Sequence, residues 1–127
     1  MTLDEYNEFC AGLPRAFHVV QWGGAHVWKV GKPAGKDSKV FAIGGWSDGA
    51  DLAVTFKVSP MSFEMLCEQP GLRPAPYLAS RGMKWVQRLT RESMDDDALK
   101  AYLTESHRLV AAGLSKKVRQ ELGLISS

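Results

Sequence analysis

The chain has 127 residues, of which 45% are hydrophobic and 24% are charged, and its formal net charge is +2. This length suits one hydrophobic core, so we expect a single domain over residues 1–127. The composition excludes disordered and fibrous chains, and no apolar run approaches the roughly 18 residues that a membrane-spanning helix needs.

The first residues and the cysteines indicate the compartment. The chain begins with acidic residues, where a signal peptide is basic and then apolar. Cys10 and Cys67 are isolated, each on the apolar side of an expected helix, which favours free thiols over a disulfide. We therefore expect a cytoplasmic protein without a membrane partner.

The N-terminal half predicts one helix followed by strands. Thr2 and Glu5 have the spacing of a capping box, and the apolar residues after them repeat at helical spacing until Gly12 and Pro14. The period then changes to two, as in half-buried strands. Strands are expected over residues 18–22, 26–30, 39–44 and 52–58. Turns or loops are expected at residues 23–24, 32–38 and 48–49.

The middle of the chain predicts a second helix and further strands. A serine followed by a proline at residues 59–60 is typical of a helix start, and the Pro-Gly pair at 70–71 of a helix end. Two prolines exclude residues 73–76 from a central strand but are compatible with an edge. Residues 83–89 alternate in polarity, which predicts a strand.

The C-terminal part predicts helices. Ser93 and Asp96 indicate the cap of a long helix that ends at Gly113, and a short helix is expected over residues 115–122. The buried stripe of the long helix is expected to contain Leu99, Tyr102, Leu103, Ser106 and Val110. The order is thus helix, three or four antiparallel strands, helix, one or two strands, then helices. It predicts an α+β fold in which helices pack on a sheet in two layers.

Basic side chains fall into three stretches. Residues 69–91 hold five basic residues and no acidic one, whereas residues 92–105 hold five acidic residues and one lysine. The second stretch contains Lys29, Lys32, Lys36 and Lys39, and the third contains Lys116, Lys117 and Arg119. A nucleic-acid footprint depends on clustering in space, which the sequence leaves open. Solvated surface is the alternative interpretation.

Two motifs suggest catalysis or phosphate binding, but the residues around them do not match the structures that those functions need. Residues 45–49 match Gly-x-Ser-x-Gly, with Asp95 and His107 following in hydrolase order. A nucleophile elbow leads into a helix, whereas a strand follows here, so we interpret the segment as a hairpin loop. Residues 31–37 lack the glycine spacing and the hydroxyl of a phosphate loop. We expect no catalytic residues.

The histidines do not predict a metal site. His18, His26 and His107 share no metal-ligand spacing, and no Cys-x-x-Cys is present, so we expect neither a metal nor a cofactor. His107 is expected at the surface or boundary of the long helix. His18 and His26 flank a Gly-Gly pair, which is compatible with the border of a groove.

Four tryptophans lie in or beside the strand region, at residues 22, 28, 46 and 85. Most of them are expected in the core, because a large ring contributes much apolar area. A partly exposed ring beside lysines is suited to stacking on bases. Trp46 and Trp85 are the candidates for such a contact.

Five segments occur in an order and spacing that resemble the MmcQ/YjbR family. They are KVFA at 39–42, FKVSP at 56–60, PGLRPAPY at 70–77, KWV at 84–86 and SHRLV at 106–110. The resemblance extends from the helix after Thr2 to Lys116 and Lys117. It implies a secretion-chaperone-like fold, also compared with frataxin, in the order helix, three strands, helix, two strands, helix. The resemblance also implies DNA binding, and the family has no set of catalytic residues to transfer to this chain. His107 departs from the tyrosine that relatives often have there.

Two functions follow. The first is non-enzymatic binding of the backbone of double-stranded DNA, without base specificity because no helix-turn-helix spacing occurs. Its candidate contacts are Lys29, Lys32, Lys36, Lys39, Lys57, Arg73, Arg81, Lys84 and Arg88. The alternative is a protein-interaction or chaperone-like module that binds a partner through an aromatic-lined sheet face. A homodimer fits either. A contiguous basic face favours the first function, and an apolar patch favours the second.

Overall fold

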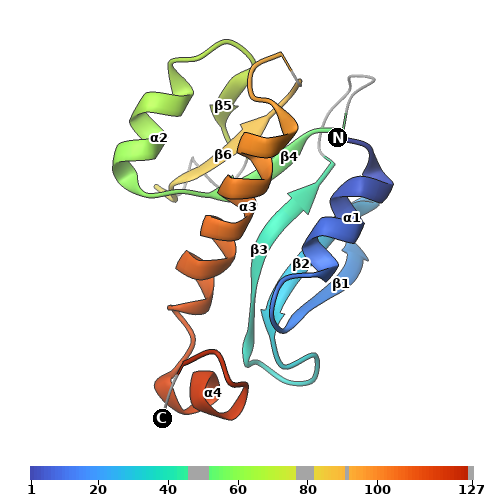
Figure 1. Cartoon of the computed structure of the whole chain (residues 1–127), viewed down its shortest axis with the longest axis vertical. Coiled ribbons are helices and arrows are strands. Elements are labelled where there is room, and N and C mark those ends of the chain that lie inside the picture. Colours follow the sequence, from blue (N-terminus) through green and yellow to red (C-terminus); the bar gives the residue numbers. More distant parts are fainter. Residues whose placement is uncertain (46–51, 77–81, 91, 126–127) are drawn as a thin grey trace.

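The structure, a computed structural model, describes residues 1–45, 52–76, 82–90 and 92–125. Within these ranges six strands form one antiparallel sheet in the order β1-β2-β3-β4-β6-β5, and helices pack on it (Figure 1). The elements are α1 (Leu3–Ala11), β1 (Ala16–Gln21), β2 (Ala25–Gly31), β3 (Ser38–Gly44), β4 (Val54–Lys57), α2 (Pro60–Cys67), β5 (Leu72–Pro74), β6 (Trp85–Arg88), α3 (Asp96–Ala111) and α4 (Lys116–Glu121). The predicted α+β architecture is confirmed. Four strands precede α2, one more than the family resemblance implied.

Local capping signals position the helices. The Thr2 hydroxyl accepts a hydrogen bond from the Glu5 backbone, and the Glu5 carboxylate accepts one from the Thr2 backbone, so the predicted capping box is present. The cap of α3 differs from the prediction. Asp95, not Ser93, accepts a hydrogen bond from the backbone of Ala98, at 2.7 Å. Ser93 instead hydrogen-bonds Thr90 at 3.1 Å, and a hydroxyl used there is not available to cap the helix.

The main core lies between one face of the sheet and the helices. α1 and α3 cover this face, and α2 packs against β5 and β6 (Figure 1). The buried residues of α3 are Leu99, Leu103, Ser106, His107, Val110 and Ala111. The predicted stripe is thus largely confirmed, with Tyr102 half-buried. His107 was expected at the surface or boundary, and that prediction is wrong: it is 7% exposed, and its Nε2–H donates to the Pro14 carbonyl at 2.7 Å.

The opposite face of the sheet carries a smaller apolar cluster. Ala25, Val27 and Ile43 are buried there. Strand register places Val27, Ile43, Thr55 and Gln87 in one row across four strands, and all four are buried. The sheet therefore buries side chains on both faces.

The serine of α3 joins two strands where they separate. β4 pairs with β3 only at Ala42–Gly44, so Phe41 and Lys57 stand at the point of divergence. The Ser106 hydroxyl accepts a hydrogen bond from the Lys57 backbone at 2.8 Å and donates one to the Phe41 carbonyl at 2.6 Å. Ser106 has no exposed surface. It supplies the hydrogen bonds that the sheet no longer provides at this point.

Both cysteines are free thiols, as the sequence predicts. In the described part of the chain, no helix is long and apolar enough to cross a bilayer. Cys10 is a buried free thiol, and burial raises its pKa to about 12. Cys67 is also free and is half-buried. Neither thiol is an activated nucleophile, because burial raises the pKa of both.

Replacing Ser106 with alanine is expected to destabilise the protein. The change leaves the Lys57 N–H and the Phe41 carbonyl without their buried partner, at a cost of about 1–3 kcal/mol. Urea unfolding measures this cost as a lower midpoint with an unchanged slope. Thr104→Ala is the matched control, because Thr104 is an exposed residue of the same helix. Equal midpoints for the two variants would contradict the bridging role of Ser106.

Candidate functional site

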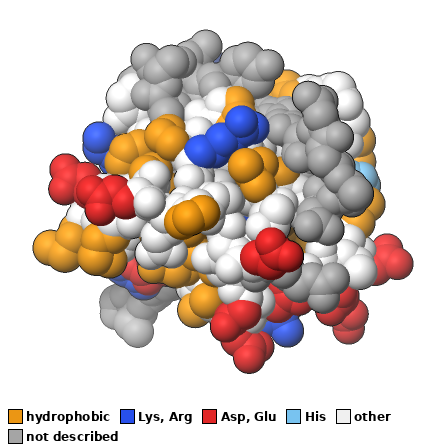
Figure 2. Space-filling model, turned by 90° about the horizontal axis from the view of Figure 1, so that it is seen from above, with side chains coloured by type: hydrophobic (Ala, Val, Ile, Leu, Met, Phe, Trp, Pro, Cys, Tyr) orange, Lys and Arg blue, Asp and Glu red, His pale blue; other side chains and the backbone are white. Residues whose placement is uncertain are grey.

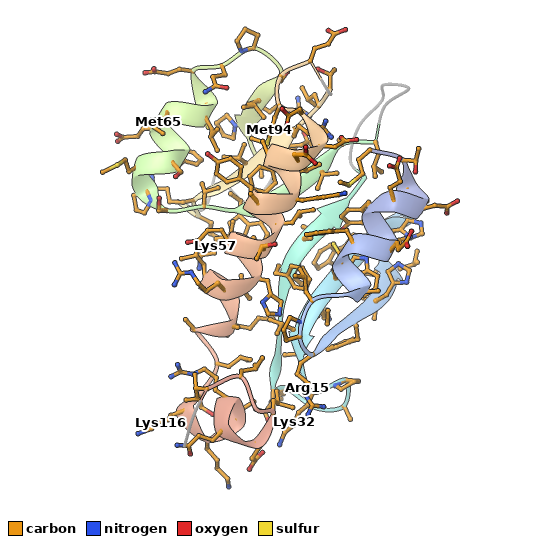
Figure 3. All side chains as sticks on the ribbon, in the orientation of Figure 1. Arg15, Lys32, Lys57, Met65, Met94 and Lys116 are labelled. Atoms are coloured by element: carbon orange, nitrogen blue, oxygen red, sulfur yellow. The ribbon has the colours of Figure 1, made fainter. Side chains whose placement is uncertain are left out.

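Two of the three basic stretches meet at one end of the molecule. Figure 3 shows Arg15, Lys32 and Lys116 together at the end that carries α4. Lys32 forms an ion pair with Glu121 of α4, and Arg15 Nε donates to the Leu122 carbonyl at 2.9 Å. Gly113, after α3, lies beside the side chain of Lys39. We name this surface the basic end and define it by Arg15, Lys32, Lys36, Lys39, Lys116 and Lys117.

Most of the basic end is free to bind an anion. All of its members except Lys32 are exposed, and Lys32 is half-buried. The hydrogen bond that Lys32 donates to the Glu121 carboxylate raises the pKa of Lys32 and lowers the pKa of Glu121. Within the described ranges, no other member forms an ion pair with a carboxylate. The other charges of the basic end thus have no direct carboxylate contact in the described ranges.

The opposite end of the molecule carries the acidic first turns of two helices. α1 and α3 both begin there (Figure 1), with Asp4 and Glu5 in the first turn of one helix and Asp96 and Asp97 in the first turn of the other. Figure 2 looks onto this end and shows acidic side chains along its margins. Carboxylates are favoured at these positions because the amino ends of helices carry partial positive charge. The described residues thus place carboxylates at two helix starts at one end and the lysines of the basic end at the other.

The nine predicted DNA contacts separate into groups. Lys32, Lys36 and Lys39 belong to the basic end. Lys29 is half-buried on β2, and Lys57 is half-buried at the end of β4 (Figure 3). Arg73 and Arg88 lie in β5 and β6, and Lys84 lies just before β6. Sequence reasoning noted Lys116 and Lys117 as a basic stretch but did not include them as contacts, because only the fold shows that α4 meets the β2–β3 loop.

The basic residues near β5 and β6 have local partners. Arg73 Nε donates to Gln87 Oε1 at 2.7 Å. Lys84 Nζ lies 4.8 Å from the centre of the Phe63 ring. Arg81 lies outside the described residues. Arg73 and Lys84 are therefore not counted in the basic end.

Arg88 was predicted to contact DNA, and the structure shows that this prediction is wrong. The alternation of β6 places it on the helix-covered face, where it is 2% exposed. Its Nε donates to the Met94 carbonyl at 2.9 Å, and its Nη2 donates to Asp96 Oδ1 at 3.0 Å. Arg88 thus ties the start of α3 to the sheet. A hydrogen bond from the Met1 amino group and this one from Arg88 lower the pKa of Asp96.

A groove opens where β4 ends. Its volume is about 350 Å³, and it is lined by Trp22, Lys39, Val40, Ile43, Lys57, Met83, Trp85, Leu109, Val110 and Gly113. Trp22 and Met83 are 52% and 40% exposed, so apolar surface faces solvent here. Trp85, predicted as an exposed aromatic contact, is only 5% exposed and contributes to the groove wall. Trp46, the other candidate, lies outside the described residues.

The structure describes two of the three residues of the rejected hydrolase motif, Asp95 and His107. Asp95 caps α3 at its start. His107 lies three turns further along the same helix, where it is buried and donates to the Pro14 carbonyl. Ser47, and the turn expected at residues 48–49, lie outside the described residues. The described His, Cys, Asp and Glu side chains also include no group of three that could hold a metal ion.

The comparisons with known proteins identify one family and one structure. A family model described as YjbR matches residues 11–109. A crystal structure of a Deinococcus radiodurans protein with a domain classed as DUF419 has a TM-score of 0.82 and 26% sequence identity. The match covers 99% of this chain and 91% of that one. The curated proteins include no significant match.

The ion pair of Asp96 is expected to make stability depend on pH. Contacts in the fold lower the pKa of Asp96. Its contribution to the free energy of unfolding is therefore complete above the ordinary aspartate pKa of about 3.9, and it is lost as the pH falls through the lowered pKa of the folded state. Urea unfolding from pH 7 to pH 2 is expected to show Asp96→Asn less stable by about 1–2 kcal/mol at neutral pH, with the gap closing in acid. Asp97→Asn is the control. A gap that persists at pH 2 would contradict this role.

Proposed function

The chain belongs to the YjbR family, and from this premise we propose that it is a non-enzymatic protein that binds the backbone of double-stranded DNA through its basic end. The observation that carries the proposal is the convergence of the Lys32–Lys39 loop region with α4, which brings two basic stretches distant in sequence onto one surface. Exposed lysines that lack carboxylate partners are suited to neutralising phosphates.

The basic end has the features of a surface that binds the phosphate backbone. Lys36 lies in the loop between β2 and β3, and Lys116 and Lys117 begin α4, so the charges come from two separate elements. Each phosphate that a lysine neutralises releases condensed counterions, and this release supplies the free energy of binding. Base-specific contacts need hydrogen-bonding side chains placed in a groove. The basic end offers charges alone, so binding is expected to be independent of sequence.

Neutralising two lysines of the basic end is expected to weaken DNA binding. The variant Lys36→Ala/Lys116→Ala removes one charge from each of the two elements. Fluorescence anisotropy of a labelled random duplex, titrated across salt concentrations, measures affinity and its salt dependence. The slope of log affinity against log salt is expected to fall by about two, since each lysine removes roughly one phosphate contact.

The matched control is Arg73→Ala/Lys84→Ala, which removes two exposed charges outside the basic end. It is expected to leave affinity and slope close to those of the wild type. If the control weakens binding as much as the basic-end variant, another surface binds the duplex. Flat anisotropy of the wild type at low salt overturns DNA binding altogether.

The groove favours a second candidate function, the binding of a partner protein. β4 leaves residues 38–40 of β3 without a strand on that side in the described ranges, and an extended segment can pair with such an edge. Lys39 and Lys57 add positive charge to an otherwise apolar lining. The partner segment expected here is extended and carries both apolar and acidic side chains.

Selection from a random displayed peptide library tests this second function. Enriched peptides are expected to combine apolar and acidic residues, and Lys57→Glu is expected to weaken their binding by about tenfold, or 1.4 kcal/mol. Met61→Ala is the control, because Met61 is 74% exposed on α2 and does not line the groove. Enrichment without acidic residues, or equal binding by Lys57→Glu, rules out this mode.

A further inference from the structure

Two histidines that are distant in sequence meet on the β1–β2 hairpin. Register pairs His18 with Trp28 and Val20 with His26, so the two histidines are diagonal neighbours on one face of the two strands. His18 Nε2 lies 3.0 Å from His26 Nδ1. The rings are nearly parallel, with an interplanar angle of 13° and centroids 5.1 Å apart. Neither the DNA-binding proposal nor the groove uses this pair.

The separation of the two nitrogens suits adjacent positions around a metal ion. Imidazole nitrogens bind zinc-sized ions at about 2.0–2.1 Å. Two nitrogens 3.0 Å apart, each at that distance from one ion, subtend an angle of about 95° at the ion. This angle is close to the right angle of tetragonal Cu²⁺ and Ni²⁺ sites, and smaller than the tetrahedral angle that Zn²⁺ prefers.

Neighbouring residues hold both histidines in place. The His18 ring stacks on Trp28 with centroids 5.1 Å apart, and Trp28 Nε1 donates to Asn7 Oδ1 at 2.9 Å. The backbone carbonyl of His26 accepts a hydrogen bond from the Tyr6 hydroxyl at 2.9 Å. α1 therefore supports the hairpin beneath the pair. His18 itself is exposed and His26 is half-buried, so the pair lies at the surface.

We propose that His18 and His26 form a two-histidine binding site for a divalent transition metal of tetragonal preference, with Cu²⁺ bound most tightly. His18 Nε2 and His26 Nδ1 would be the ligands, and water would fill the remaining positions. Without metal, one of these nitrogens carries the hydrogen that joins the pair. Metal binding requires that ring to carry its proton on the other nitrogen, so both imidazoles remain neutral. Cu²⁺ ranks first because affinity for nitrogen sites rises along the divalent series to copper.

Titration of the full chain with Cu²⁺ alone at pH 7.5 tests the site. Calorimetry is expected to show one site per chain, and electron paramagnetic resonance is expected to show a tetragonal spectrum with coupling to two nitrogens. His18→Ala and His26→Ala are each expected to lower the affinity for Cu²⁺ by at least about tenfold. Loss of a residue that only hydrogen-bonds a metal ligand already lowers metal affinity by about that factor. Ni²⁺ is expected to bind at the same residues more weakly than Cu²⁺.

Two controls keep the test decisive. Cys67→Ser is expected to bind Cu²⁺ as the wild type does, which excludes the partly accessible thiol as the ligand. Thermal unfolding of each variant without metal shows whether the fold is kept, and added Cu²⁺ is expected to raise the Tm of the wild type but not of the histidine variants. Equal affinity in the wild type and both histidine variants, or loss of binding in Cys67→Ser, overturns the proposal. Failure of DNA binding leaves it unaffected.

Discussion

The hydroxyl of Ser106 is the interaction on which the arrangement of the molecule depends. It satisfies an N–H from β4 and a carbonyl from β3 at the point where these strands separate, and it has no exposed surface. The strands can diverge there only because α3 supplies the missing partners. Three features follow from this divergence. The groove opens beyond it, α3 continues past the end of β4, and the chain after α3 reaches the β2–β3 loop.

Basic side chains have three different roles that composition does not distinguish. Arg88 joins the sheet to α3 from inside the core, Lys57 lines an apolar groove, and Lys116 is solvated at the basic end. A buried guanidinium needs fixed acceptors, which Met94 and Asp96 provide. A solvated lysine needs none, and it keeps its charge available for a partner.

The sequence predicts features that depend on neighbouring residues. The capping box at Thr2, the helix start at Ser59 and the alternating strands were predicted because each signal acts over a few positions. Ser93 and Asp95 are both good caps, so only tertiary contact decides between them. Arg88 alternates correctly in its strand, but the sequence does not show which face the helices cover. The candidate sites also depend on contacts that the sequence does not show. The pairing of His18 with His26 depends on the register of β1 and β2, and the contact of Lys32 with α4 depends on the path of α3.

The separation of charge between the two ends has a consequence for how copies of the molecule meet. The acidic first turns of α1 and α3 lie at one end of the molecule, and the basic end lies at the other. Two copies that meet head to tail therefore bring the carboxylates of one copy near the lysines of the other, although each copy is nearly neutral. At 0.1 M salt the attraction between these charges is screened beyond about 10 Å. Added salt thus favours the dispersed chain in concentrated solution, the behaviour known as salting-in.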